Sequence, residues 1–123
     1  MKPEIKAAWI AALRSGEYKQ TRGKLHRSFR MTGDSLVEEY CCLGVLCSVL
    51  GYEEEEAAYY NGPNEAPYRR FRISDGQTAI GFLPDEVAEE IGLTKAQMQF
   101  LANKNDHYGY TFEQIADLVE GLL

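Results

Sequence analysis

Long apolar runs are absent from this sequence. No stretch of its 123 residues approaches the roughly 18–20 consecutive apolar residues that span a membrane. Residues 1–15 carry Glu4, Lys6 and Arg14 where a signal peptide has an uninterrupted apolar region. Cytoplasmic residence is therefore the default expectation. At this length the chain is expected to form one domain over residues 1–123.

Histidine and cysteine are scarce, and they lack the spacing of a metal site. The chain has two histidines and three cysteines, Cys41, Cys42 and Cys47, without the C-x2-C spacing of zinc ligands. An odd number of cysteines in one short segment argues against a disulfide framework, so we expect reduced thiols. The phosphate-binding pattern GxxxxGK(S/T) is missing, and no GxGxxG follows a strand. Neither a metal nor another cofactor is predicted.

Negative charge dominates only the later part of the chain. Residues 1–36 contain eight lysines and arginines against three acids, residues 37–123 contain five against sixteen, and the net charge is −6. An acidic protein repels the phosphates of duplex DNA, so general DNA binding is not predicted. A basic segment on an acidic body favours a small anion as ligand, although a solvated face accounts for the same charges.

The densest apolar segment, residues 40–51, is predicted to be the centre of the core. A short buried helix is expected from Cys41 or Cys42 to Leu50, with Gly51 as its left-handed C-terminal cap. Apolar residues at helical spacing form its inner face, namely Leu43, Leu46, Cys47 and Leu50.

Cap and turn signals predict four more helices. These helices are expected to start near Pro3, Pro84, Thr94 and Thr111. Gly16 and Gly92 are expected to end the first two, and Gln97 and Gln114 to complete capping boxes in the last two. The polar segment from Asn103 to Tyr110 is predicted to be a loop.

Two hairpins are predicted, which gives an α+β fold. Residues 25–31 pair with 36–40, and residues 68–74 pair with 78–83 across an Asp-Gly turn. Between them, residues 52–67 are predicted to be a mobile insertion, because the four adjacent acids of Glu53–Glu56 favour a ragged helical turn or an exposed loop. The expected architecture is a small antiparallel sheet of two hairpins packed with four to five short helices.

The cysteines permit one enzymatic interpretation. A thiol at the start of a helix has a lowered pKa, because the helix dipole favours the thiolate. Cys41 or Cys42 occupies that position, and His107 is a candidate base, in the order found in some cysteine hydrolases. Thiols in an apolar run pack more often than they react, so buried thiols are the favoured interpretation and the hydrolase is the alternative.

Cationic and aromatic side chains in the predicted loops and hairpins favour an anionic ligand. Guanidinium groups bind phosphate through paired hydrogen bonds, and tyrosine rings stack on a base. The sequence therefore predicts a non-enzymatic binder of a nucleotide-derived small molecule. The candidate ligand-binding residues are Lys19, Gln20, Arg22, Lys24, Arg70 and Tyr108, with Arg69, Arg72, Tyr59, Tyr60, Tyr68 and Tyr110 as further contributors.

A set of spaced residues accompanies the cysteine segment Y-C-C-L-G-V-L-C at positions 40–47. It comprises Trp9, Leu13, Gly16, Tyr18, Gln20, Gly23, Leu25, Leu83-Pro84, Val87, Gly92-Leu93, Asn105-Asp106, Phe112 and Ile115-Ala116-Asp117. With these residues the chain resembles a family of small, mostly uncharacterised proteins of tailed phages and prophages. It departs from that family at Ile91, where a tryptophan is expected, and in a longer spacing between Asp106 and Phe112.

The resemblance implies a phage accessory protein in the cytoplasm of a host cell, and it implies no particular activity. Small phage proteins often act on host defence by sequestering a nucleotide signal or by blocking a host protein, which is an analogy of context. Blocking a host protein is the basis of another alternative: the chain is an inhibitor, and its acidic body mimics nucleic acid when it binds the host protein. A homodimer is a further expectation, because ligand pockets often form between subunits.

Overall fold

The computed structural model has the predicted α+β class, with five helices and six strands in the residues it describes, 1–22, 25–30, 36–60, 67–74, 77–79 and 83–122. The helices are α1 (Pro3–Arg14), α2 (Cys42–Val49), α3 (Asp85–Ile91), α4 (Lys95–Asp106) and α5 (Phe112–Leu122). The strands are β1 (Lys19–Gln20), β2 (His26–Arg30), β3 (Leu36–Tyr40), β4 (Glu53–Tyr60), β5 (Pro67–Ser74) and β6 (Gln77–Ala79). None of the described helices combines the length and apolar character needed to cross a membrane.

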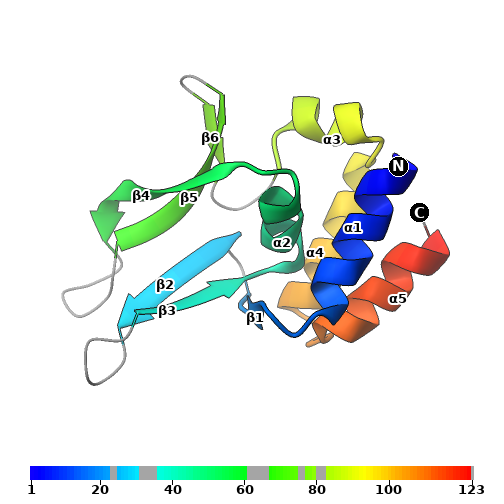
Figure 1. Cartoon of the computed structure of the whole chain (residues 1–123), viewed down its shortest axis with the longest axis horizontal. Coiled ribbons are helices and arrows are strands. Elements are labelled where there is room, and N and C mark those ends of the chain that lie inside the picture. Colours follow the sequence, from blue (N-terminus) through cyan, green and yellow to red (C-terminus); the bar gives the residue numbers. More distant parts are fainter. Residues whose placement is uncertain (23–24, 31–35, 61–66, 75–76, 80–82, 123) are drawn as a thin grey trace.

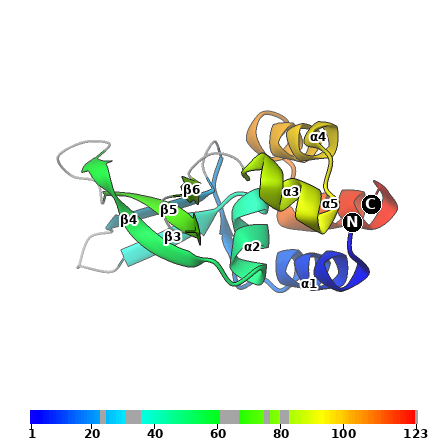
Figure 2. The ribbon, with the colours of Figure 1, turned by 90° about the horizontal axis from the view of Figure 1, so that it is seen from above.

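Helices and strands occupy different ends of the molecule (Figure 1). Helices α1, α3, α4 and α5 gather at the end that holds both chain termini, and the longer strands form the other end (Figure 2). Helix α2 lies between the two groups, in contact with α1 and α4 on the helical side and with β3 on the strand side. The short strand β1 lies near this boundary (Figure 1), and the side chain of Gln20 on β1 reaches Asn105 of α4 and the carbonyl oxygen of Tyr110, which precedes α5.

Both predicted hairpins are present, as the antiparallel pairs β2–β3 and β5–β6. Their turns at 32–35 and 75–76, and residues 80–82, lie outside the described residues. Each hairpin belongs to its own three-stranded sheet, with strand orders β1-β3-β2 and β4-β5-β6. In addition, β1 pairs with β3 in parallel, with Lys19 beside Glu39. A loop was predicted where β1 lies, because two residues carry no strand periodicity.

The acidic run belongs to a strand. Glu53–Glu56 begins β4, which pairs antiparallel with β5, so the predicted helical turn or exposed loop is wrong, and so is the mobile insertion over residues 53–60. Opposite charges across an antiparallel pair stabilise it by roughly 0.2–1 kcal/mol each, and this stabilisation exists only once the two segments meet. Among the side chains that the structure describes, the register places one such pair, Glu53 opposite Arg72.

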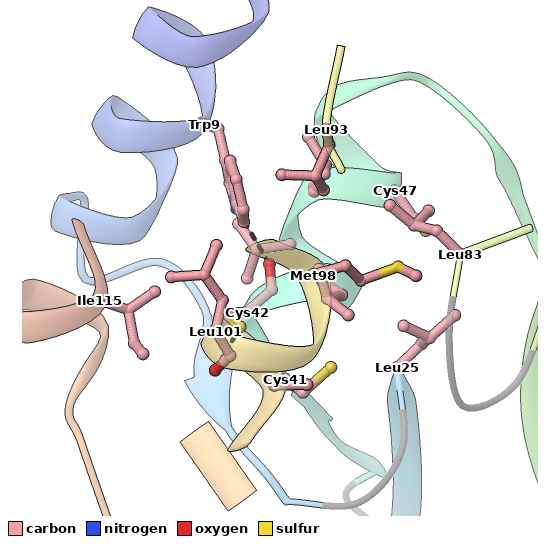
Figure 3. Close-up of a cluster of buried hydrophobic side chains, with 14 of the residues drawn as sticks. Trp9, Leu25, Cys41, Cys42, Cys47, Leu83, Leu93, Met98, Leu101 and Ile115 are labelled. Carbon is pink, nitrogen blue, oxygen red and sulfur yellow. Dashed lines mark hydrogen bonds between the residues drawn. The ribbon is translucent and has the colours of Figure 1, made fainter. Parts of the chain in front are cut away.

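Helix α2 is the centre of the core, as the sequence predicts. Every residue from Cys42 to Cys47 is buried, and all three cysteines are free and buried. Trp9 of α1 is fully buried against this helix, and its Nε1 donates a hydrogen bond to the carbonyl oxygen of Cys42 at 2.9 Å (Figure 3). Gly51 follows the helix with a φ of +83°, which confirms the predicted left-handed residue. The other side chains of the cluster in Figure 3 include Leu25, Leu83, Leu93, Met98, Leu101 and Ile115.

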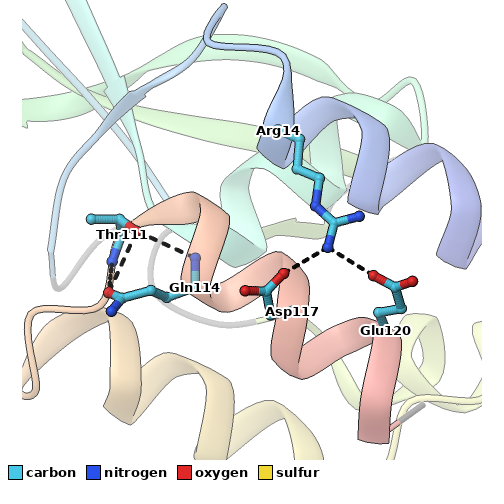
Figure 4. A network of polar contacts seen from close by, with 5 residues as sticks. All are labelled: Arg14, Thr111, Gln114, Asp117 and Glu120. Carbon is cyan, nitrogen blue, oxygen red and sulfur yellow. Dashed lines mark hydrogen bonds and ion pairs between the residues drawn. The ribbon is translucent and has the colours of Figure 1, made fainter.

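Cap signals located most of the helix ends. Thr94 and Gln97 form the predicted capping box of α4, and Thr111 and Gln114 exchange the corresponding hydrogen bonds at the start of α5 (Figure 4). Gly92 has a φ of +80° and ends α3 as predicted. Helix α4, however, continues to Asp106, so the predicted loop begins about four residues too early.

Helices α1 and α5 pack together and share one exposed ion-pair cluster. Arg14 Nη2 donates to Asp117 Oδ1 and to Glu120 Oε2, both at 2.7 Å (Figure 4). The hydrogen bonds to Glu120 and then Asp117 raise the pKa of Arg14. Exposed ion pairs contribute little to stability, so the buried apolar face of α5, which includes Ile115 and Val119, is the main source of this packing.

The close approach of Gly44 to the backbone of Leu25 predicts the effect of a single added methyl group. A Cβ on Gly44 would overlap the carbonyl oxygen of Leu25, which already accepts a hydrogen bond from the Cys41 amide at 3.2 Å. We expect Gly44→Ala to lower the free energy of unfolding by roughly 3 kcal/mol, or to prevent folding. Urea unfolding followed by Trp9 fluorescence measures this change.

Gly121→Ala in α5 is the matched control for that substitution. No other atom lies within 4 Å of the Cβ position of Gly121, so this change is expected to stabilise the protein by at most about 1 kcal/mol. Small and similar effects of the two substitutions would contradict the tight contact between α2 and Leu25.

Candidate functional site

A buried hydrogen-bond network joins β1 to the end of α4. The side chain of Asn105 is fully buried, and its Oδ1 accepts a hydrogen bond from Gln20 Nε2 at 2.7 Å. Asn105 Nδ2 donates to the carbonyl oxygen of Thr21 at 2.9 Å and to Asp106 Oδ1 at 2.8 Å. Gln20 Nε2 also donates to the carbonyl oxygen of Tyr110 at 2.6 Å. The network therefore holds β1, the last turn of α4 and the α4–α5 connection (residues 107–111) in one place.

Two cationic side chains lie against the α4–α5 connection. Gly109 has a φ of +68°, and a Cβ at this position would lie 3.9 Å from Nη2 of Arg22. Lys104 Nζ approaches the connection from α4 and lies over aromatic rings, a contact that stabilises by about 0.5–1 kcal/mol at exposed sites. The distances from Nζ to the ring centroids are 4.4 Å for Tyr108, 5.2 Å for Tyr110 and 5.3 Å for Phe100.

A hollow of about 460 Å³ lies along α4 and ends at the same connection. Its volume falls in the range of roughly 300–1,000 Å³ typical of small-molecule sites. The described part of its lining offers an aromatic ring that can stack on a base, two side-chain amides and an imidazole that can form hydrogen bonds with a base, and a carboxylate that can accept a hydrogen bond from a base but repels a phosphate. These residues form one stripe of α4 and its C-cap, and they include Phe100, Gln99, Asn103, Asp106 and His107.

Three of the predicted ligand-binding residues come together at this junction. Arg22 is exposed beside Gly109, and the side chain of Tyr108 is 63% exposed in the same connection. Gln20 is the third, but its amide nitrogen already donates to Asn105 and to the Tyr110 carbonyl. Gln20 therefore positions the site, and Arg22 and Tyr108 are the predicted residues that remain accessible to a ligand.

The other predicted cations are not part of this junction. Lys19 lies beside Glu39 in the parallel register, and successive residues of a strand point to opposite faces, which separates it from Gln20. Arg70 lies in the other sheet and is opposite Glu55 in the register. Lys24 lies outside the described residues. The further contributors Arg69, Arg72, Tyr59, Tyr60 and Tyr68 also belong to strands of that other sheet.

The cysteines have the environment of packed side chains. Burial raises the pKa of the Cys41 thiol from 9.0 to about 12, and it also raises the pKa of Cys42. Cys42 Sγ lies 3.7 Å from the carbonyl oxygen of Leu101, which it contacts as a weak donor. His107, the candidate base, is exposed at the C-cap of α4. The loss of solvent outweighs the helix dipole, so this arrangement does not favour a thiolate nucleophile.

Two important residues of the junction, Lys104 and Asn105, were absent from the predicted site. Both fall in the segment that was predicted to be a loop because of its polar composition, N-K-N-D at residues 103–106. Helix α4 in fact continues through these four residues. The spacing of Phe100 and Lys104 at i and i+4 was a usable signal, because such residues lie on one helix face. Among the described residues, no group of three His, Cys, Asp or Glu side chains forms a possible metal site.

The burial of the thiols predicts their reactivity. Because their pKa values are raised, the thiols stay neutral at pH 8, and the native protein is expected to react with iodoacetamide at least about 100-fold more slowly than the urea-unfolded protein. Quenched alkylation and mass spectrometry measure both rates. Rapid alkylation of native Cys41 or Cys42 at pH 8 would restore the hydrolase alternative.

The buried network predicts a strong effect at Asn105. Asn105→Ala removes the acceptor for Gln20 and the donor to the Thr21 carbonyl, so we expect a loss of about 2–3 kcal/mol in the free energy of unfolding. Asn103→Ala is the matched control, because Asn103 is exposed on the same helix and its substitution is expected to change stability by less than about 0.5 kcal/mol. Urea unfolding compares the two, and equal effects would show that the network contributes nothing specific.

Comparison with known proteins and families identifies the family of this chain. No curated protein and no solved structure matches the chain significantly. One protein family matches it from the first residue to the last, over residues 1–123. The chain therefore belongs to the family described as "Domain of unknown function (DUF8296)".

Proposed function

We propose that this protein is a phage-type accessory protein that binds a small, anionic, nucleotide-derived molecule without catalysis. The ligand site is the hollow along α4 together with the α4–α5 connection. Arg22 contacts a phosphate group, and the exposed ring of Tyr108 stacks on the base. Sequestration of such a ligand removes a signal from the host, in keeping with the resemblance to small phage proteins.

The observation that carries this proposal is the position of Arg22 beside Gly109. A guanidinium from the basic N-terminal segment lies against a connection that carries an exposed tyrosine, next to a hollow of suitable volume. In the described residues Arg22 has no carboxylate within ion-pair distance, whereas Arg14 binds two. Its paired donors are therefore available for the bidentate contact that arginine makes with phosphate.

The surrounding groups suit a nucleotide better than a larger partner. The hollow holds one small molecule, and the side-chain amides of Gln99 and Asn103 in its lining are able to donate to and accept from a base. Phe100, which is 40% exposed, adds an apolar surface to the same lining. The net charge of −6 opposes a polyanion, while a single phosphate group experiences mainly the local cations.

Calorimetry tests this proposal directly. We expect wild-type protein to release or absorb heat with at least one member of a panel of cyclic nucleotides and ADP-ribose-type nucleotides at micromolar protein. Arg22→Gln is expected to weaken that binding about 10–100-fold, since a hydrogen bond to a charged group is worth roughly 1.5–3 kcal/mol when both partners are desolvated.

Lys2→Gln provides the matched control for charge. Lys2 is exposed. Its backbone amide donates a hydrogen bond to the carbonyl oxygen of Ile91, near the start of α4 and far from the α4–α5 connection. Loss of the Lys2 charge is therefore expected to change affinity less than twofold. Absence of binding across the panel, or equal losses in the Arg22 and Lys2 variants, would contradict the proposed site.

A further inference from the structure

Arg22 and Lys104 approach one short segment, residues 108–110, from two different parts of the chain. Arg22 follows β1 and lies against Gly109, whereas Lys104 projects from α4 onto the rings of Tyr108 and Tyr110. Gly109 is the residue between those two tyrosines, so the two cations flank one short segment. The Gln20–Asn105 network joins β1 to α4, and Gln20 also donates to the Tyr110 carbonyl, so the backbone elements that carry the two cations are held to the same segment.

The rings around Lys104 hold its ammonium group in place. Three rings, those of Phe100, Tyr108 and Tyr110, lie within 5.3 Å of Nζ, which restricts a side chain that is normally among the most flexible. A cation that is already ordered loses little further entropy when an anion binds to it. The ammonium also occupies the place that a cationic ligand would need, so this aromatic cluster is suited to an anion and not to an amine.

Among the described residues, no carboxylate lies within ion-pair distance of either cation. The acid nearest to Lys104 in the sequence is Asp106. Its carboxylate accepts a hydrogen bond from Asn105 Nδ2 and is part of the buried network. An ammonium group has three N–H donors, and aromatic rings do not supply the oxygen acceptors that these donors bind most strongly. Both cations are therefore able to donate to phosphate oxygens.

We propose that Arg22 and Lys104 form a two-point clamp that selects ligands with two linked phosphates over ligands with one. This inference rests on the proposed function and names its ligand class, a nucleoside diphosphate or a molecule built on one. One phosphate binds the guanidinium, the neighbouring phosphate binds the ammonium, and the base or sugar extends into the hollow along α4. A monophosphate satisfies only one of the two cations.

The test compares AMP with ADP by calorimetry in the wild-type protein and in Lys104→Gln. We expect the wild type to bind ADP about tenfold more tightly than AMP, because one charge-assisted contact is gained. In Lys104→Gln the two affinities are expected to become equal, through weaker binding of ADP. Lys104→Arg keeps a cation over the rings and is expected to retain the preference. Lys95→Gln, at the other end of the same exposed helix, is the charge control and is expected to leave the ratio unchanged.

The possible outcomes separate the clamp from the proposed function. Equal binding of AMP and ADP by the wild type would overturn the clamp and leave the nucleotide site intact. The clamp is also overturned if Lys104→Gln weakens both ligands equally, since that is the effect of a merely structural role. Failure of every nucleotide to bind at millimolar concentration would overturn both the clamp and the proposed function. Near-UV circular dichroism of the tyrosines checks that each variant keeps its fold.

Discussion

The burial of helix α2 on all sides is the constraint on which the rest of the structure depends. A helix with no solvent-facing stripe needs a partner in every direction, and here α1, α4 and the first sheet supply them. The fit is closest at Gly44, where the Leu25 carbonyl takes the space of a side chain, and at Cys42, where the indole of Trp9 binds the helix backbone. Such close contacts fix the sheet and the helices relative to each other.

The candidate site depends on that arrangement because it is built from both sides of α2. Strand β1 extends the first sheet toward the helices, and α4 packs on α2 with Asn105 buried at its end. Satisfying that buried amide requires Gln20 and Thr21, since an unpaired polar group in the core is costly. The same hydrogen bonds bring the basic segment that follows β1 against the α4–α5 connection. The packing of the core therefore also determines the geometry of the candidate site.

Some cations of the described residues lie opposite an acid in a sheet, and others do not. In the register of the second sheet Glu53 is opposite Arg72, and in the first sheet Lys19 is beside Glu39. The acidic run of Glu53–Glu56 is therefore part of a paired strand. Arg22 and Lys104 lie outside this pattern, at the junction of the sheet and the helices. Their position, more than their number, favours a small anionic ligand.

The sequence by itself determined the features whose cause is local. Caps at Thr94 and Thr111, left-handed glycines at 51 and 92, both hairpins and the buried cysteine helix were predictable because each depends on residues within a few positions. Only the tertiary structure decided that Glu53–Glu56 is a strand, that α4 continues to Asp106 and which cations meet. Glu53 needs Arg72, Asn105 needs Gln20, and Arg22 needs Gly109. Those partners lie 19 to 87 residues away, beyond the reach of any periodicity or cap signal, and they meet only in the packed core around α2.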